Sequence, residues 1–179
     1  MKKPIKILAV SVLAVSVSLF VLSIGLHISG IYINTTPSLP VGFYKVANEP
    51  IVSGAHVAFC PPQNEVFDMA MDRSYINQGN CPGGYGLLLK RVFALSGDTV
   101  SIDQTGIFVN GDHLPNSAQL KTDAEGQPLP QYRLKAVLND SEYLLLSDLN
   151  PQSFDARYFG LIARDQIQQV VRPVFTWSH

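Results

Sequence analysis

The chain has 179 residues, 46% of them apolar, and a formal net charge of −1 at pH 7. This length accommodates one domain of ordinary size together with an anchor. A charge so close to zero excludes the strongly basic character that nucleic-acid binding requires, so we expect no nucleic-acid partner.

The N-terminal segment predicts a membrane anchor. Residues 7–33 contain no Asp, Glu, Lys or Arg, and this run exceeds the ~20 apolar residues that a spanning helix needs. Lysines at positions 2, 3 and 6 form a short basic head, which favours a cytoplasmic N-terminus. We therefore expect residues 1–33 to cross the inner (cytoplasmic) membrane once and to contact the lipid bilayer, with Tyr32 as an interfacial aromatic. Residues 34–179 then form a periplasmic domain.

A cleavable signal peptide is the alternative interpretation of the same segment. The apolar region of a signal peptide is usually about 7–15 residues long and ends at an Ala-x-Ala-like site. The run here is longer, and residues 26–32 lack such a site. The sequence therefore favours a retained anchor.

After Tyr44 the chain reads as short strands separated by turns. Continuous or alternating apolar residues predict strands at residues 51–59, 87–95, 99–102, 106–109, 143–146 and 167–174. Asn110-Gly111 is a hairpin signal, and one short helix is expected near residues 66–71. Residues 115–131 are polar and read as an exposed loop. The soluble part is therefore mainly β.

The cysteine and histidine content argues against a metal site. Cys60 and Cys81 are too few for a disulfide scaffold and lack metal-ligand spacing. Outside the cytoplasm a single bridge between them is expected, and two unpaired buried thiols are the alternative. The four histidines are scattered along the chain. We expect neither a metal nor a cofactor.

Ser38 is a candidate nucleophile. Pro37 and Pro40 fix the backbone on both sides of it, because proline locks φ and lacks an N–H donor. The position lies a few residues after the apolar segment. An ordinary proline-rich linker would have the same composition.

Lys90 is a candidate general base. In a strand it shares one face with Leu88 and Val92, which predicts partial desolvation of its ammonium. Desolvation lowers the pKa of a lysine, and catalytic lysines are tuned in this way to about 7–8. The alternative is a strand lysine that extends its ammonium to water.

A polar cluster at residues 147–157 follows a predicted strand. It is dense in turn-forming residues, which is typical of a capped loop. Asp155 could form an ion pair with Arg157 there, or it could orient a neighbouring base.

Taken together, these segments resemble a known family. Residues 38–44, 89–100, 147–150 and 153–160 occur in the order found in type I signal peptidases, and Phe108-Val109-Asn110-Gly111 is similar to a hairpin of that fold. The Ser-x-Pro-x-Gly-x-Tyr box at residues 38–44 resembles the TraF-type peptidases of bacterial conjugative transfer. The resemblance spans residues 34 to about 172.

The resemblance implies a signal-peptidase-like β fold and a membrane-anchored Ser/Lys endopeptidase. Ser38 is then the nucleophile, Lys90 the general base and Asp155 a supporting residue. The Ser38 backbone N–H and the Thr36 hydroxyl would stabilise the oxyanion. In one departure from the family, Ala156 stands where a serine is common, which removes one candidate partner of the lysine. In another, Asp-Leu-Asn at residues 148–150 replaces Asp-Asn-Arg.

The resemblance also implies a partner, namely a membrane-tethered precursor protein with small side chains before the cleaved bond. In the TraF branch this is a propilin or another conjugative transfer protein, and some members close the product into a ring. A general signal peptidase acting on signal-peptide-bearing proteins is one alternative. A non-enzymatic scaffold of a conjugation or secretion complex is the other, and it predicts that Ser38 and Lys90 lie far apart and that Lys90 titrates normally.

Overall fold

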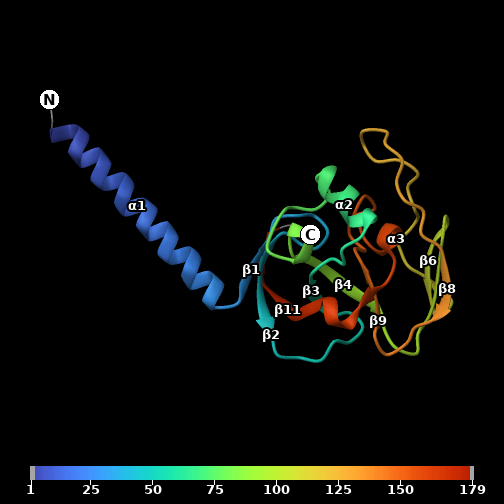
Figure 1. Cartoon of the computed structure of the whole chain (residues 1–179). Coiled ribbons are helices and arrows are strands. Elements are labelled where there is room, and N and C mark those ends of the chain that lie inside the picture. The colour runs from blue at the N-terminus through green and yellow to red at the C-terminus, as the bar shows by residue number, and fades with distance from the viewer. Residues whose placement is uncertain (1–2, 178–179) are drawn as a thin grey trace.

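The computed structural model describes the backbone of residues 3–177 and the side chains of residues 7–21, 25 and 29–177. Helix α1 projects from a domain built of two β-sheets (Figure 1). The prediction of a mainly β domain is confirmed.

Helix α1 runs from Lys3 to Ile28, and most of its described side chains are apolar and exposed. The predicted membrane span is not supported: within the described part of the chain, no helix combines the length and hydropathy needed to cross a bilayer. The apolar run behind that prediction is divided, because Gly30 turns with a φ of 65° and residues 31–34 form a strand. The single-pass topology lacks support for the same reason. Its basic head, Lys2, Lys3 and Lys6, lies outside the described side chains.

Strand β1 (Ile31–Asn34) pairs antiparallel with β2 (Gly42–Ala47), and residues 35–41 form the loop between them. The backbone N–H of Val46 donates to the Gly30 carbonyl at 2.9 Å, which fixes the end of α1 against β2. Tyr32, predicted as an interfacial aromatic, lies in β1 and accepts a hydrogen bond from Gln169 at 2.6 Å.

The larger sheet has seven strands in the order β1-β2-β11-β3-β4-β9-β10. Its remaining strands are β3 (His56–Phe59), β4 (Leu88–Ala94), β9 (Glu142–Leu146), β10 (Ile162–Ala163) and β11 (Ile167–Thr176). Adjacent strands are antiparallel. β11, from the C-terminal end of the chain, therefore lies between two strands from the N-terminal half.

The smaller sheet has the order β7-β6-β5-β8. Its strands are β5 (Thr99–Asp103), β6 (Gly106–Val109), β7 (Asp112–His113) and β8 (Leu134–Val137). The predicted turn at Asn110-Gly111 joins β6 to β7, and both of its residues have positive φ.

Two short helices and two 3₁₀ turns complete the fold: α2 (Glu65–Asp72), α3 (Ala156–Phe159), η1 (Pro82–Gly84) and η2 (Arg164–Gln166). The helix predicted near residues 66–71 is α2. Asn64 begins it by accepting hydrogen bonds from two backbone N–H groups of the first turn.

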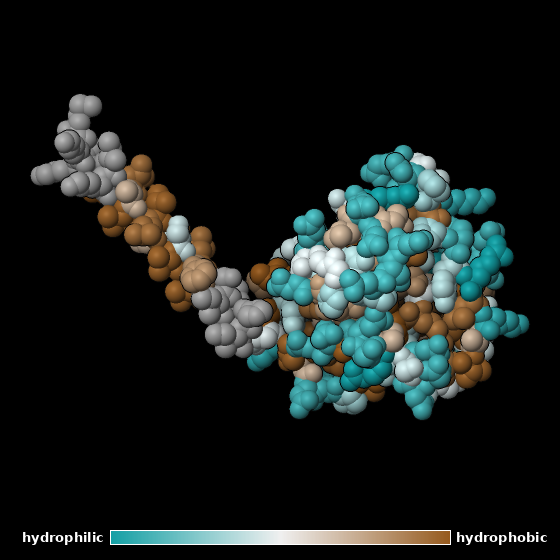
Figure 2. Space-filling view, viewed as in Figure 1, coloured by the Kyte–Doolittle hydropathy of each residue, from teal (hydrophilic) through white to brown (hydrophobic). Residues whose placement is uncertain are grey.

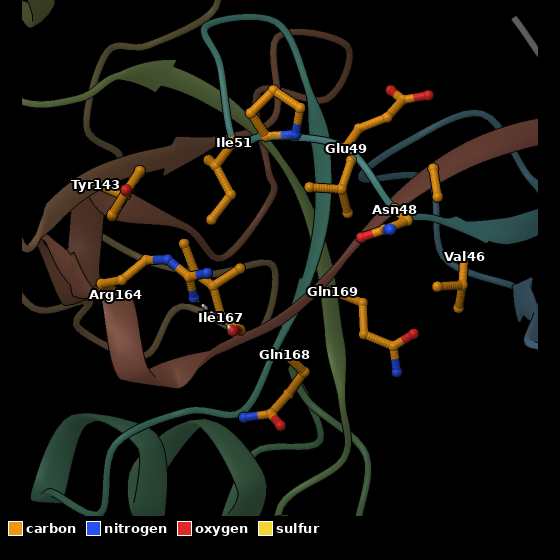
Figure 3. A pocket seen from close by; sticks show the side chains of 12 residues that line it. Val46, Asn48, Glu49, Ile51, Tyr143, Arg164, Ile167, Gln168 and Gln169 are labelled. Carbon is orange, nitrogen blue, oxygen red and sulfur yellow. Dashed lines mark hydrogen bonds between the residues drawn. The ribbon is translucent and has the colours of Figure 1, made fainter.

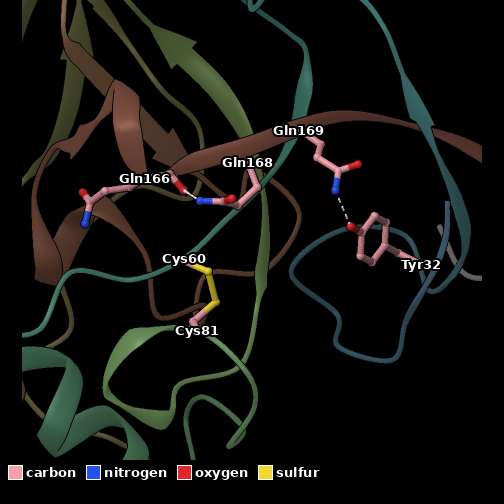
Figure 4. The surroundings of a disulfide bond; sticks show 6 residues. All are labelled: Tyr32, Cys60, Cys81, Gln166, Gln168 and Gln169. Carbon is pink, nitrogen blue, oxygen red and sulfur yellow. Dashed lines mark hydrogen bonds between the residues drawn. A yellow bond between two sulfur atoms is a disulfide. The ribbon is translucent and has the colours of Figure 1, made fainter. Parts of the chain in front are cut away.

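Cys60 and Cys81 form a disulfide bond, and their Cα atoms are 5.5 Å apart (Figure 4). The bond joins the residue after β3 to the residue before η1. It therefore links the larger sheet to the irregular segment between α2 and β4.

Candidate active site

The loop that carries Ser38 is organised by one buried side chain, Asn34. Its Nδ2 donates to the carbonyls of Thr36, Leu39 and Pro40 at 2.9, 3.0 and 3.2 Å. Its Oδ1 accepts from the Thr36 backbone N–H at 3.3 Å. Because these contacts fall on both sides of Ser38, they set the position of its backbone.

Lys90 lies on β4 and only 4% of it is exposed. Its Nζ donates to the Ser38 Oγ at 2.8 Å and to the Ser153 Oγ at 2.8 Å. The two serine oxygens are 3.2 Å apart. The structure therefore brings the two candidate residues from the sequence together and adds a third.

Burial lowers the pKa of Lys90 from 10.5 to about 8, because the ammonium loses its hydration and gains only two hydroxyl partners. The negative charge of Asp155 opposes this shift, and the positive charge of Arg157 reinforces it. Lys90 is therefore poised to exchange a proton near neutral pH, in contrast to a lysine in water.

Ser153 is the residue that the sequence interpretation missed. With alanine at position 156, the one candidate hydroxyl partner that a serine there would supply is absent. Ser153 supplies the hydroxyl from three positions earlier. Its place in the polar loop at residues 147–157, two residues before Asp155, was the available signal.

Asp155 and Arg157 form a fully buried ion pair beside this centre, with 2.8 Å between Arg157 Nη2 and Asp155 Oδ2. Asp155 also begins α3, because its side chain accepts the Arg157 backbone N–H. Arg157 Nη2 in turn donates to the Ser153 carbonyl at 2.8 Å. Asp155 thus supports the loop that presents Ser153, and no direct hydrogen bond to Lys90 is recorded among the described residues.

Thr36, the candidate oxyanion donor, is exposed on the Ser38 loop. Its hydroxyl donates to the Asn34 Oδ1 at 3.1 Å. The hydroxyl hydrogen is therefore directed at Asn34. Among the described residues, no acceptor is recorded for the Ser38 backbone N–H.

Two cavities open on Ser38. One of about 190 Å³ is lined by Ser38, Lys90 and apolar residues that include Leu87 and Leu89. The other, of about 540 Å³, has Ser38, Ser153 and the segment 120–125 in its wall. Ser38 therefore lines both cavities.

A further hollow of about 350 Å³ lies elsewhere, between the chain after β2 and the start of β11 (Figure 3). Arg164 points into it and donates to the Ile167 carbonyl at 3.2 Å. None of the site residues predicted from the sequence lines it.

The sequence as a whole is similar to known proteins. The family described as "Signal peptidase, peptidase S26" matches residues 2–177. A plasmid transfer protein TraF of Escherichia coli is 47% identical over 178 residues, which cover 99% of this chain and 100% of that protein. A second Escherichia coli protein of the same name is 50% identical over 84% of this chain and 86% of its own length.

A more distant TraF relative supports the same assignment. A conjugal transfer protein TraF of Agrobacterium fabrum is 36% identical over 84% of this chain and 85% of its own length. A signal peptidase I of Enterococcus faecalis, known from a crystal structure, is 17% identical with a TM-score of 0.40, covering 70% of this chain and 100% of that one. The full-length matches carry the assignment: the chain belongs to the signal peptidase S26 family, in its TraF-type group.

Proposed function

We propose that this chain is a serine endopeptidase in which Ser38 is the nucleophile and Lys90 the general base. The observation that carries the proposal is the 2.8 Å contact between Lys90 Nζ and Ser38 Oγ, made by a lysine that is almost fully buried. The scaffold alternative predicts two distant residues and an ordinary lysine. Both expectations disagree with this geometry and with the lowered pKa of Lys90.

The reaction follows from the positions of these groups. Neutral Lys90 accepts the hydroxyl proton as Ser38 Oγ attacks the peptide carbonyl carbon, and an oxyanion forms. The Ser38 backbone N–H stabilises that oxyanion, and the Thr36 hydroxyl joins it by rotating away from Asn34. The C–N bond then breaks, the leaving amine takes the proton from Lys90, and an acyl ester remains on Ser38.

The ester is released by a second attack through the same base. Water gives hydrolysis, and the substrate's own α-amine gives a ring. In both cases Lys90 accepts the proton of the attacking group and passes it to Ser38 Oγ as the ester C–O bond breaks. Ser153 holds Nζ between the two steps, because it is the other acceptor within 2.8 Å. Asp155 acts through Arg157 and the Ser153 loop, as a positioning residue.

The substrate is proposed from the relatives, whose names place them in plasmid and conjugal transfer. We propose a precursor protein of the conjugation apparatus, such as a propilin, in the periplasm. We also propose that the domain works beside the membrane, attached through the exposed apolar side chains of α1. A general signal peptidase would instead support growth of cells depleted of their housekeeping enzyme.

Covalent trapping tests the nucleophile. A serine-directed phosphonate probe should add its mass to the peptide that contains Ser38, and Lys90→Ala should abolish labelling. Ser101→Ala, a serine on β5 in the smaller sheet, is the matched control and should label normally. Labelling that persists in Ser38→Ala would contradict the proposal.

A donor-cell assay tests the substrate. Cells that carry Ser38→Ala should accumulate an unprocessed precursor of the transfer apparatus and should lose conjugation. Processing that continues in such cells would exclude this role.

A further inference from the structure

The larger cavity at Ser38, of about 540 Å³, has a group of large apolar and aromatic side chains in its wall. On the face of the domain shown in Figure 2, hydrophilic side chains predominate, so a hollow of this kind beside a nucleophile is a distinct feature. The reaction steps described above do not use it. We call the group the apolar wall, and its members are Tyr75, Leu120, Leu129, Phe154 and Tyr158.

The apolar wall is preformed, because its rings pack on one another and on the core. The Phe154 ring is stacked on Tyr158 with 5.9 Å between the centroids, and its centroid lies 5.6 Å from that of Tyr75. The Phe154 ring also meets the fully buried Phe67 of α2 at 6.0 Å. Phe154 directly follows Ser153, the partner of Lys90. The wall is therefore fixed next to the reacting groups.

Residues 120–129 form a loop that supplies another part of the wall. The Asp123 carboxylate in this loop accepts the Tyr75 hydroxyl and lies 3.8 Å from Arg73 Nη1. Arg73 Nη1 also donates to the Pro128 carbonyl at 2.9 Å. These bonds tie the loop to the segment that follows α2, so the two sides of the cavity are held together.

The smaller cavity, which contains Lys90, offers a strand edge instead. Leu88 and Leu89 of β4 line it and pair with β3 on one side. Within the described chain, β9 joins β4 only from Arg91 onward. The other edge at Leu88 and Leu89 can therefore pair with the backbone of an extended peptide, whatever side chains that peptide carries.

The two parts of a cleaved substrate place different demands on these cavities. The acyl segment, which precedes the cleaved bond, stays on Ser38 through both steps of the reaction. Backbone pairing beside Lys90 keeps its ester next to the base. The leaving segment, which follows the cleaved bond, binds before the first step and departs after it. A side-chain contact in a separate cavity meets that demand.

We propose that the larger cavity binds the leaving segment, and that the substrate carries a large apolar side chain among the first three residues after the cleaved bond. Three extended residues span at most about 11 Å, which brings such a side chain from Ser38 into a cavity that begins at Ser38. Leu120 is the specificity-determining residue, since at 37% it is the most exposed member of the apolar wall. This inference rests on the proposed peptidase function and adds a class of substrate.

Cleavage of a peptide mixture tests the preference. The full chain in detergent is given peptides with six consecutive random positions, and the products are sequenced by mass spectrometry. Leucine, isoleucine, methionine or phenylalanine should be enriched about 10- to 100-fold over glycine at one of the first three positions of the leaving fragments, because burial of a large apolar side chain supplies that much binding.

Leu120→Asp tests the wall itself. Two peptides that differ only in leucine or lysine at the enriched position are compared, and the variant should lower the leucine-to-lysine ratio of kcat/KM at least about tenfold, because a carboxylate disfavours an apolar neighbour and attracts an ammonium. This ratio does not depend on the folded fraction, since the same molecules cleave both peptides. Val137→Asp, at a 63% exposed residue of the smaller sheet, is the matched control and should leave the ratio unchanged.

An ester substrate identifies which segment the wall binds. An activated ester with the same acyl segment and no leaving peptide should be hydrolysed by Leu120→Asp at the wild-type rate. Equal losses on the ester and on the leucine peptide would place the acyl segment in the larger cavity and overturn the assignment.

Two further results would overturn the inference. One is a set of leaving fragments without apolar enrichment, and the other is an unchanged leucine-to-lysine ratio in Leu120→Asp. Covalent trapping of Ser38 in the same preparation judges the peptidase separately. An enzyme that is labelled but shows no preference refutes this inference alone, whereas an enzyme that is neither labelled nor active refutes both.

Discussion

Two buried cationic side chains, Lys90 and Arg157, lie close together, but their pKa values shift in opposite directions. Arg157 is fully buried, yet its pKa is raised: desolvation works to lower it, and the hydrogen bonds and charge of Asp155 outweigh that effect. Among the described residues Lys90 has no carboxylate within hydrogen-bond distance and donates to two hydroxyls, so burial lowers its pKa. Burial alone therefore does not activate a base; burial without a counter-charge does.

The division of labour follows from this difference. Arg157 is a structural cation that donates to the carbonyls of Asn116, Asn150, Pro151 and Ser153. Those bonds fix the loop that presents Ser153. The permanently charged Arg157 thus holds the loop in place, while Lys90, with its pKa lowered to about 8, can exchange a proton near neutral pH.

Removing the carboxylate that pairs with Arg157 should have the largest effect on stability. Asp155→Ala leaves a buried guanidinium unpaired and should lower the free energy of unfolding by about 3–5 kcal/mol, measured by urea denaturation. It should also lower the pKa of Lys90 further, because the charge of Asp155 raises it.

A more exposed ion pair, Asp148–Arg91, supplies the control. Asp148 contacts Arg91 at 2.8 Å, but these side chains are 21% and 40% exposed. Asp148→Ala should therefore cost at most about 1 kcal/mol. Equal losses for the two aspartates would mean that burial of the Asp155 pair has no special role.

Removing the buried amine of Lys90 should have the next largest effect. Between pH about 8 and 10.5 the unfolded chain holds a proton on Lys90 that the folded protein lacks, so stability rises with pH in that window. Below pH about 8 Lys90 is protonated in both the folded and the unfolded chain, so the full free-energy cost of burying its charge remains. Lys90→Met should abolish this rise and stabilise the protein at pH 7 by up to about 3 kcal/mol.

Denaturation at pH 7 and at pH 9 measures this change, and Lys135→Met, on an exposed lysine, should leave the pH dependence intact. A wild-type stability that does not change between these two pH values would refute the lowered pKa.

Peptidase activity of the wild type should rise about tenfold per pH unit below pH 8 and level off above it, because only neutral Lys90 is a base.

The smallest effect is expected on removal of the Ser153 hydroxyl, which accepts a hydrogen bond from Lys90. Ser153→Ala removes one of the two acceptors of the Lys90 ammonium and should reduce kcat about ten- to a hundredfold, as the loss of one charged hydrogen bond predicts. The pKa seen in the pH–rate profile should shift downward, because the charged form loses a partner. Ser153→Thr keeps the hydroxyl and should restore much of the rate; no difference between the two variants would exclude this role.

Local patterns predicted most of the secondary structure. The apolar run at residues 87–95 predicted β4, and the short helix expected near residues 66–71 is α2. β1 was missed because Ile31–Ile33 continue the apolar composition of the helix, and only the positive φ of Gly30 separates them. The buried helix α3 (Ala156–Phe159) spans one turn, which is too short for a helical period to appear.

Site residues could be predicted where the local sequence alone indicates their role. Ser38 between two prolines and Lys90 within an apolar strand are both visible locally. Ser153 and Asn34 are not, because their roles come from contacts through space: Ser153 meets Ser38 across 115 residues. The hydroxyl of Thr36 could likewise not be assigned to Asn34 before the loop geometry was known.

The place of β11 has a consequence for how the enzyme comes into being. Ser38 lies on the hairpin of β1 and β2 and Lys90 lies on β4, and β11 is the strand that joins β2 to β3 between them. Until residues 167–176 are inserted, the hairpin that carries Ser38 and the strand that carries Lys90 share no sheet. A chain truncated before β11 should therefore lack the contact between Ser38 and Lys90.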